Sequence, residues 1–221
     1  MDYYPSICRI IHVQLDRPFL LLSPTVDGDV LSKLALAEAE FTPPQVHRLI
    51  DRHSVEGVRN ALQRLTEQGI VLQRRAGMAR LYQLNRNHLA APAVIAIAQI
   101  RSQLIERLRD RFGEWSIRTP YSALFGSAAT GQMRPDSDLD IFVVRPARTK
   151  PESDTWRSQL DGLSRDCSLW TGNDCRILEY SATEVGRAVS SNDAVLQDIR
   201  AKGIRLVGTS DYLLQSTKVA A

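Results

Sequence analysis

The segment LFGSAATGQMRPDSDLDIFVV, residues 124–144, decides what kind of fold the second half of the chain forms. Two apolar runs flank a small polar stretch, so the segment predicts a strand, a turn with a short helix, and a second strand. The second strand begins with Asp138-Leu139-Asp140. Residues two apart on a strand face the same side, so these two carboxylates lie together. Such a pair is costly unless a proton or a cation lies between the charges, and it therefore indicates a cation site.

The turn between the two strands has the properties of a phosphate site. Gly126 lets the backbone turn tightly and approach a ligand with no side chain in the way. Ser127 and the amides that follow lie at the start of a helix, where exposed N–H groups favour a triphosphate. Carboxylate and phosphate oxygens together suit Mg²⁺. We therefore predict that Asp138 and Asp140 bind this metal.

The order of these residues resembles a known signature. An apolar residue, Gly-Ser, ten residues and Asp-x-Asp between apolar residues are similar to the DNA polymerase beta-like nucleotidyltransferases, especially their minimal, antitoxin-type members. The segment NDAVLQDIRAKGIRLVG, residues 192–208, resembles the closing helix and strand of those domains. The resemblance covers residues 117–208 and implies a mixed sheet with flanking helices, Mg²⁺, and a nucleoside triphosphate substrate, with ATP expected. It assigns nucleotide binding to Gly126, Ser127, Arg134 and Ser137.

The chain departs from this family pattern at two places. Thr130 stands where the family often has an arginine, and Arg134 follows four residues later. Active members also take a third carboxylate from the next core strand, here within GNDCRILEYS, residues 172–181. Our alignment puts Arg176 at that acidic position, with Asp174 two residues earlier on the same predicted face. We predict Asp138, Asp140 and Asp174 as the catalytic carboxylates, while Arg176 favours a site that has lost catalysis.

The first half of the chain predicts three helices followed by a hairpin. Apolar residues recur at helical spacing in residues 27–40, 43–51 and 55–68, with Thr42 and Ser54 as N-caps. The segment IVLQRRAGMARLYQLNR, residues 70–86, alternates as two strands with Ala76-Gly77 at the tip. This order resembles the winged helix-turn-helix of MarR- and ArsR-like bacterial regulators. Earlier in the chain, SICRIIHV and FLLL are interpreted as short strands or an arm.

Positive charge is concentrated in the same half. Residues 47–86 contain eight arginines and three acidic residues, whereas residues 113–221 contain thirteen basic and fourteen acidic residues. A local excess of arginine favours a polyanionic partner, and the resemblance implies double-stranded DNA. Arg59, Asn60 and Gln63 are predicted to read bases, and His53, Arg74, Arg75 and Arg80 to lie along phosphates. The alternative is that these residues form the solvated face of a protein-interaction module.

Composition and organisation set the remaining expectations. No apolar run approaches the roughly 20 residues of a membrane span, and no secretory signal is evident, so we expect a cytoplasmic protein without a membrane partner. Three cysteines without CxxC spacing indicate reduced thiols. Residues 88–112 predict one long helix with an apolar side available for a homodimer. The expected domains are a winged helix with its arm (1–90), a linker helix (91–116), a nucleotidyltransferase fold (117–210) and a tail (211–221).

Two functions follow from these patterns for an α/β (α+β) protein of this kind. The first is an enzyme that transfers a nucleoside monophosphate from Mg-NTP to a hydroxyl on a protein, an RNA or a small molecule. The second is a non-catalytic winged-helix transcriptional regulator or antitoxin-like protein whose second domain senses a nucleotide or binds a partner. The Gly-Ser and Asp-x-Asp residues favour the enzyme, and Arg176 favours the regulator.

Overall fold

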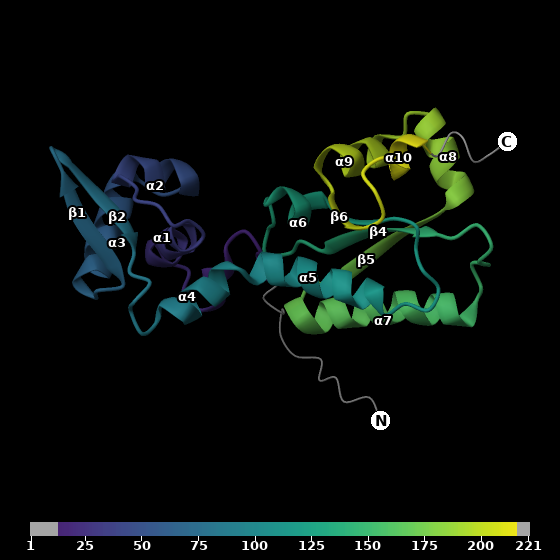
Figure 1. Ribbon diagram of the computed structural model, residues 1–221, viewed down its shortest axis with the longest axis horizontal. Helices are drawn as coiled ribbons and strands as arrows, with labels where there is room; N and C mark the ends of the chain where they lie inside the picture. The colour runs from purple at the N-terminus through teal and green to yellow at the C-terminus, as the bar shows by residue number, and fades with distance from the viewer. Residues whose placement is uncertain (1–12, 216–221) are drawn as a thin grey trace, which may run out of the picture. The chain divides into compact units, whose positions relative to one another are not determined.

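The computed structural model describes residues 13–215, which divide into two compact units (Figure 1). The N-terminal unit is residues 17–103, and the C-terminal unit combines residues 13–16 with residues 104–215. The fold class is the predicted mixture of helices with a mixed sheet. In the described part of the chain, no helix combines the length and the apolar character that crossing a bilayer requires.

The N-terminal unit contains the predicted three helices and hairpin. The helices are α1 (Val26–Ala35), α2 (Pro43–Ile50) and α3 (Val55–Glu67). Strands β1 (Val71–Ala76) and β2 (Ala79–Leu84) pair antiparallel, and Phe41 bridges to Tyr82 beside them. The helices pack together because their apolar stripes meet in one core. This core includes Val30, Leu34, Val46, Val58, Leu62, Leu65 and Tyr82.

Local sequence signals set the ends of these helices. Ser54 Oγ accepts a hydrogen bond from the Gly57 N–H at 3.0 Å, which is the predicted N-cap of α3. At α2, the Thr42 N–H donates to Gln45 Oε1 at 2.7 Å in the return half of a capping box. Gly69 follows α3 with φ +78°, a left-handed conformation that favours glycine.

Two sequence-based expectations for this half were wrong in detail, and a third falls almost wholly outside the described residues. FLLL forms part of a 3₁₀ helix, η1 (Pro18–Leu21), and is not a strand. Phe19 is buried beside Gly28 of α1, whereas Leu21 and Leu22 are exposed. Of SICRIIHV, residues 6–12 lie outside the described residues. The hairpin loop is Gly77-Met78, one residue later than expected, since Ala76 still pairs with Ala79.

The predicted single helix over residues 88–112 is two helices, α4 (Ala91–Ala98) and α5 (Ile100–Gly113). The chain leaves helical geometry at Gln99, whose φ and ψ are −90° and 4°. Gln103 Nε2 donates to the Ala96 carbonyl at 3.2 Å. In a continuous helix, the Ile100 N–H would bond to that same carbonyl. The side chain therefore competes with the helix at the break, which a pattern of apolar residues does not reveal.

The C-terminal unit is built on a four-stranded mixed sheet in the order β5-β4-β3-β6. Its strands are β3 (Ser122–Phe125), β4 (Leu139–Arg145), β5 (Cys175–Ser181) and β6 (Ile204–Val207). Strand β3 pairs antiparallel with β4 and β6, while β4 and β5 are parallel. A parallel pair needs a long crossover, and α7 (Asp154–Thr171) supplies it.

Helices cover both faces of this sheet (Figure 1). On one face, Phe142 and Val144 of β4 pack in a core with Val185 of α8 (Ala182–Ser190) and Ile199 of α9 (Ala194–Lys202). The opposite face meets α7, where Trp156 Nε1 donates to Glu179 Oε1 at 3.0 Å. Glu179 also pairs with Arg145, as expected for a residue turned away from the Asp138–Asp140 face.

The chain after residue 210 does not begin as a free tail. A short helix, α10 (Tyr212–Gln215), follows β6. Tyr212 stacks on Tyr121 with ring centroids 5.5 Å apart and planes at 11°, and Leu213 is buried. Apolar side chains therefore hold residues 211–214 on the core, while residues 216–221 lie outside the described residues.

Two of the three cysteines lie in the C-terminal unit as free thiols, and Cys8 lies outside the described residues. Cys167 of α7 is buried, and Cys175 begins β5. A hydrogen bond between the two thiols, together with burial, raises the pKa of Cys167. At neutral pH, this thiol is therefore protonated.

Candidate functional site

Gly126 and Asp140 form the centre of the predicted site. Strand β3 ends at Phe125, the register partner of Asp140, and α6 (Gly126–Thr130) begins at the next residue. Gly126 has φ +68°, and a Cβ built on it would lie 2.5 Å from Asp140 Oδ2. A side chain here would strain the backbone and would force the Asp140 carboxylate to move. The glycine therefore lets a carboxylate lie directly against the turn.

The two aspartates share a face as the strand period predicted. Asp140 is the second residue of β4 and Asp138 immediately precedes the strand, while the intervening Leu139 is fully buried. Burial raises the pKa of Asp140, the negative charge of Asp138 raises it further, and Arg176 partly offsets both effects. The two carboxylates therefore carry more negative charge than Arg176 neutralises.

Arg176 lies where the sequence pattern expects a third carboxylate. It is the register partner of Asp140 on the parallel strand β5. Its Nη2 forms an ion pair with Asp138 Oδ2 at 2.8 Å. The arginine side chain is 75% exposed, whereas the Asp138 side chain is 17% exposed. Arg176 therefore lies beside both aspartates.

Asp174 does not join the pair in a metal-binding group. Its side chain is exposed, and it precedes the first residue of β5. Within residues 13–215, no three His, Cys, Asp or Glu side chains come together in a way that could hold a metal ion. The expected group of Asp138, Asp140 and Asp174 is therefore not formed in the structure. What Asp174 contributes is its backbone carbonyl, which accepts the Leu139 N–H at 2.8 Å.

Asn173 positions the loop in front of the site, a role that the sequence did not reveal. The side chain is fully buried and its Nδ2 donates to the Ser137 carbonyl at 2.9 Å. Its Oδ1 accepts the Val13 N–H at 3.0 Å. A buried amide with both ends bonded holds the residue before Asp138 in place. The sequence signal for this positioning role was the pair Gly172-Asn173, which lies between a helix and a strand.

Arg134 and Ser137 form a turn ahead of the aspartates. Ser137 Oγ accepts the Arg134 N–H at 2.8 Å, and the Ser137 N–H donates to the Arg134 carbonyl at 3.0 Å. The Ser137 oxygen therefore accepts a bond within the loop, and its O–H can still donate to a ligand. Arg134 is exposed.

The predicted base-reading residues lie on the exposed side of α3. Arg59, Asn60 and Gln63 are all exposed, while Val58 and Leu62 are buried in the core. Arg59 pairs with Glu56 at 3.4 Å, and Gln63 Nε2 donates to Glu67 at 3.0 Å. Such exposed pairs are weak, so these side chains can be redirected by a ligand.

The hairpin places Arg75 and Arg80 directly opposite each other. Both are exposed, and among the described residues neither has an ion-pair partner. Like charges opposite each other in a hairpin repel. Arg74, in contrast, bonds to Glu40, and this contact lowers the pKa of Glu40. The arginines of the hairpin are therefore not equivalent.

His53, which the sequence predicts to lie along phosphates, is bonded to a carboxylate within the N-terminal unit. Its Nε2 lies 2.7 Å from Asp29 Oδ2, and Asp29 also accepts Arg17 Nε at 3.1 Å and Nη2 at 2.7 Å. Burial alone would raise the pKa of Asp29, but the hydrogen bonds from Arg17 and His53 hold it below its ordinary value. The imidazole therefore joins α1 to the turn before α3.

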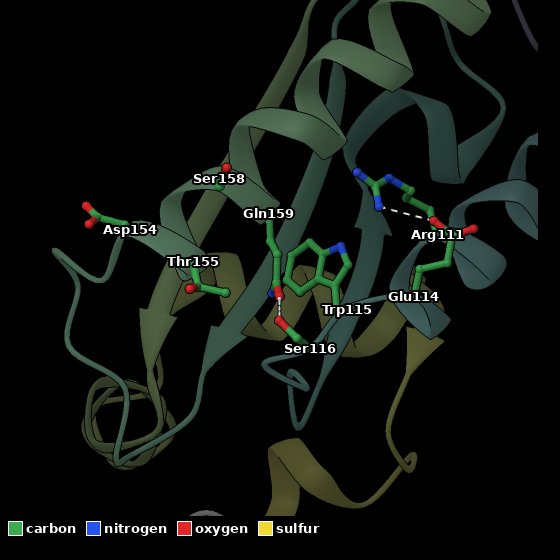
Figure 2. Close-up of a pocket in the computed structure, with 8 residues that line it drawn as sticks. All are labelled: Arg111, Glu114, Trp115, Ser116, Asp154, Thr155, Ser158 and Gln159. Carbon is green, nitrogen blue, oxygen red and sulfur yellow. Dashed lines mark hydrogen bonds and ion pairs between the residues drawn. The ribbon is translucent and has the colours of Figure 1, made fainter.

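A surface hollow of about 480 Å³ lies between the end of α5 and the start of α7 (Figure 2). Trp115, Ser116 and Gln159 line it, with Ser116 Oγ donating to Gln159 Oε1 at 2.8 Å. A neighbouring hollow includes Trp170, over which Arg107 lies at 5.8 Å. Trp170 is partly buried there. None of the predicted site residues lines either hollow.

Comparison with known proteins supports the C-terminal site. Residues 101–176 match the family model of the nucleotidyltransferase domain. The chain is therefore similar to nucleotidyltransferases over a segment that includes the Gly126 turn, both aspartates and Arg176. No match was found among curated proteins.

Two solved structures are similar to part of this chain. The first is a toxin–antitoxin with AMP-PNP, with 24% identity over 53% of this chain and 82% of that chain, and a TM-score of 0.34. The second is a mutant of the toxin–antitoxin MntA-HpeT, with 17% identity over 53% of this chain and 83% of that chain, also at a TM-score of 0.34.

Proposed function

We propose that the C-terminal unit binds a nucleoside triphosphate with Mg²⁺ and transfers its nucleoside monophosphate to a hydroxyl acceptor. The observation that carries this proposal is the contact between Asp140 and the Gly126 turn, where an Asp138–Asp140 pair meets backbone open to a ligand. The match of residues 101–176 to the nucleotidyltransferase domain supports it.

The residues present suit a magnesium ion. Mg²⁺ is commonly held by one or two carboxylates together with substrate phosphates. Asp138 and Asp140 provide two carboxylates on one face, and the raised pKa of Asp140 marks a place where a cation would be stabilised. Asp138 and Asp140 would hold the ion, which supplies positive charge against the phosphate oxygens during transfer.

The chain's own residues would position the nucleotide. The turn at Gly126-Ser127 offers backbone N–H groups to the phosphates, and the missing side chain at Gly126 lets them approach. The acceptor hydroxyl attacks the α-phosphorus in line, and pyrophosphate leaves from the opposite side. We assign the proton of the hydroxyl to the exposed carboxylate of Asp174, because a general base need not touch the metal. The backbone carbonyl of the same residue accepts the N–H of Leu139, the residue between the two aspartates, at 2.8 Å.

We further propose that the N-terminal unit binds double-stranded DNA. Support comes from the exposed row of Arg59, Asn60 and Gln63 on α3 and from the hairpin arginines Arg75 and Arg80. Arginine, asparagine and glutamine can bond to base edges, and arginines at a hairpin can neutralise phosphates.

The second candidate function is a non-catalytic regulator whose C-terminal unit senses a nucleotide or binds a partner. One observation favours it: Arg176 occupies the third carboxylate position and neutralises Asp138. In this case, nucleotide binding would persist without transfer.

The deciding experiment compares the wild-type chain with Asp138→Asn, Asp140→Asn and Asp174→Asn. Each is incubated with Mg²⁺ and NTPs labelled at the α-phosphate, and cell lysate supplies acceptors. We expect transfer by the wild type, loss of nucleotide binding in the first two variants, and binding without transfer in Asp174→Asn. Asp161→Asn, an exposed carboxylate change on α7, is the control. Binding without transfer by the wild type supports the regulator, and unchanged transfer in Asp174→Asn removes this residue as the base.

A further inference from the structure

We propose that Arg176 is a nucleotide-binding residue that changes partners: it neutralises Asp138 in the free protein and moves to the nucleotide phosphates when a cation occupies the aspartate pair. This inference rests on the proposed function, because it requires the site to accept a metal and a nucleotide. It assigns Arg176 a binding role, which an arginine that merely closes the site would not have.

The position of Arg176 allows both contacts. The residue lies beside Asp140 in the β4–β5 register, and its Nη2 reaches Asp138 at 2.8 Å. Phe125 is the register partner of Asp140 on the other side, so the Gly126 turn and Arg176 flank the same aspartate. Phosphates on the turn would therefore lie within the region that the arginine side chain can sweep.

Because the guanidinium is exposed, Arg176 can leave Asp138 at a small cost in free energy. The Arg176 side chain is 75% exposed, so water can replace Asp138 at low cost. Breaking an exposed ion pair of this kind changes an equilibrium constant by less than about sixfold. The Asp138 side chain is only 17% exposed, so its carboxylate is destabilised more than the guanidinium when the ion pair is broken. A cation at Asp138 removes that cost and leaves the arginine free.

The chemistry of the released side chain favours phosphate. A guanidinium presents several N–H donors in a plane and bonds to phosphate oxygens through two of them. Lysine carries the same charge but lacks this geometry. The proposal therefore predicts opposite effects of Arg176 on the two ligands: competition with the metal alone and cooperation with the metal–nucleotide complex.

The test measures the two ligands separately on the full chain. Electron paramagnetic resonance reports Mn²⁺ binding without nucleotide, and calorimetry at saturating Mn²⁺ reports binding of a non-hydrolysable ATP analogue. For Arg176→Ala, we expect Mn²⁺ to bind up to about sixfold more tightly and the analogue to bind about tenfold more weakly. Arg176→Lys should recover only part of the loss. Arg157→Ala removes an arginine of 56% exposure from α7 and should change neither value.

Three outcomes would overturn the inference. If Arg176→Ala binds both Mn²⁺ and the analogue more tightly, the arginine only blocks the site. If the analogue binds Arg176→Ala as it binds the wild type, while Asp140→Asn loses Mn²⁺, the proposed function stands and the partner exchange is wrong. If the wild type binds neither ligand, the proposed function itself fails, and the inference fails with it.

Discussion

Arg176 and Asp138 form an ion pair of 2.8 Å across the parallel strands of the C-terminal unit, at the edge where the nucleotidyltransferase pattern expects a third carboxylate. A site with two carboxylates and an arginine has less negative charge than one with three carboxylates. The metal that such a site holds therefore depends more on the nucleotide phosphates. The ion pair therefore bears on both candidate functions, transfer with a nucleotide-bound metal and nucleotide binding without transfer.

The Arg176–Asp138 pair should contribute a measurable coupling energy to the free energy of unfolding. In a double-mutant cycle of Arg176→Ala with Asp138→Asn, we expect the two changes to be non-additive by about 0.2–1 kcal/mol, because the arginine is exposed. Chemical denaturation followed by tryptophan fluorescence measures this, since all three tryptophans lie in the C-terminal unit. Arg157→Ala with Asp138→Asn should be additive, and a zero value for the first cycle would contradict the pair.

Gly126→Ala should impair both stability and the site. Its φ of +68° costs a side chain about 1–2 kcal/mol, and the added Cβ would displace the Asp140 carboxylate. We expect lower stability by tryptophan fluorescence and loss of Mn²⁺ binding. Gly131→Ala is the matched control, because its φ is +71° and its Cβ would make only an ordinary contact at 3.8 Å. Equal loss of Mn²⁺ binding in both variants would show that backbone strain alone is responsible.

Asp140→Asn should stabilise the fold while it removes the metal ligand. The pKa of Asp140 is raised above 3.8 in the folded protein, so stability falls as the pH rises from 3.8 through that raised pKa, and the full cost of the charged form is present above it. We expect the Tm near neutral pH to rise by no more than about 2–4 °C, the shift that 1 kcal/mol gives in a chain of this size. The difference should vanish below pH 3.8, where the side chain is protonated in both folded and unfolded states. A Tm lower than that of the wild type at neutral pH would refute the assignment.

The hairpin arginines should contribute unequally to DNA binding. Arg75→Ala with Arg80→Ala should weaken duplex binding for all sequences and reduce the salt slope by up to ~2, because each phosphate contact contributes about 0.9. Glu40→Gln should release Arg74 and increase the slope by up to ~1. Fluorescence anisotropy over a series of salt concentrations measures the slopes. No binding by the wild type at ~50 mM salt would rule out the DNA proposal, since phosphate contacts are strongest at low salt.

Asp29 should make the stability of the N-terminal unit depend on pH. The pKa of Asp29 is lowered in the fold, so its stabilisation is present above 3.8 and is lost as the pH falls through the lowered value. Asp29→Asn should cost about 1.5–3 kcal/mol at neutral pH, because it weakens bonds to Arg17 and His53. The loss should be seen by circular dichroism but not by tryptophan fluorescence. Asp27→Asn, which breaks an exposed pair with Arg64, should cost less than about 1 kcal/mol.

Several features followed from local sequence alone. The shared face of Asp138 and Asp140 follows from the strand period, the N-cap at Ser54 from its hydroxyl, and the left-handed turn at Gly126 from the absence of a Cβ. Each depends on residues within a few positions of one another. The chain therefore determines them before any distant segment has packed.

The chemistry of the site depended on tertiary contacts between distant segments. The sheet order puts Arg176 beside Asp140 across 36 positions of sequence and leaves Asp174 at an exposed loop end. In the N-terminal unit, packing of α1 against the turn before α3 joins His53 to Asp29 through a contact of 2.7 Å. Apolar periodicity specifies which face of an element is buried, but it does not specify which charged groups meet. Strand register and helix packing decide that, because they set the distances on which ion pairs and metal ligands depend.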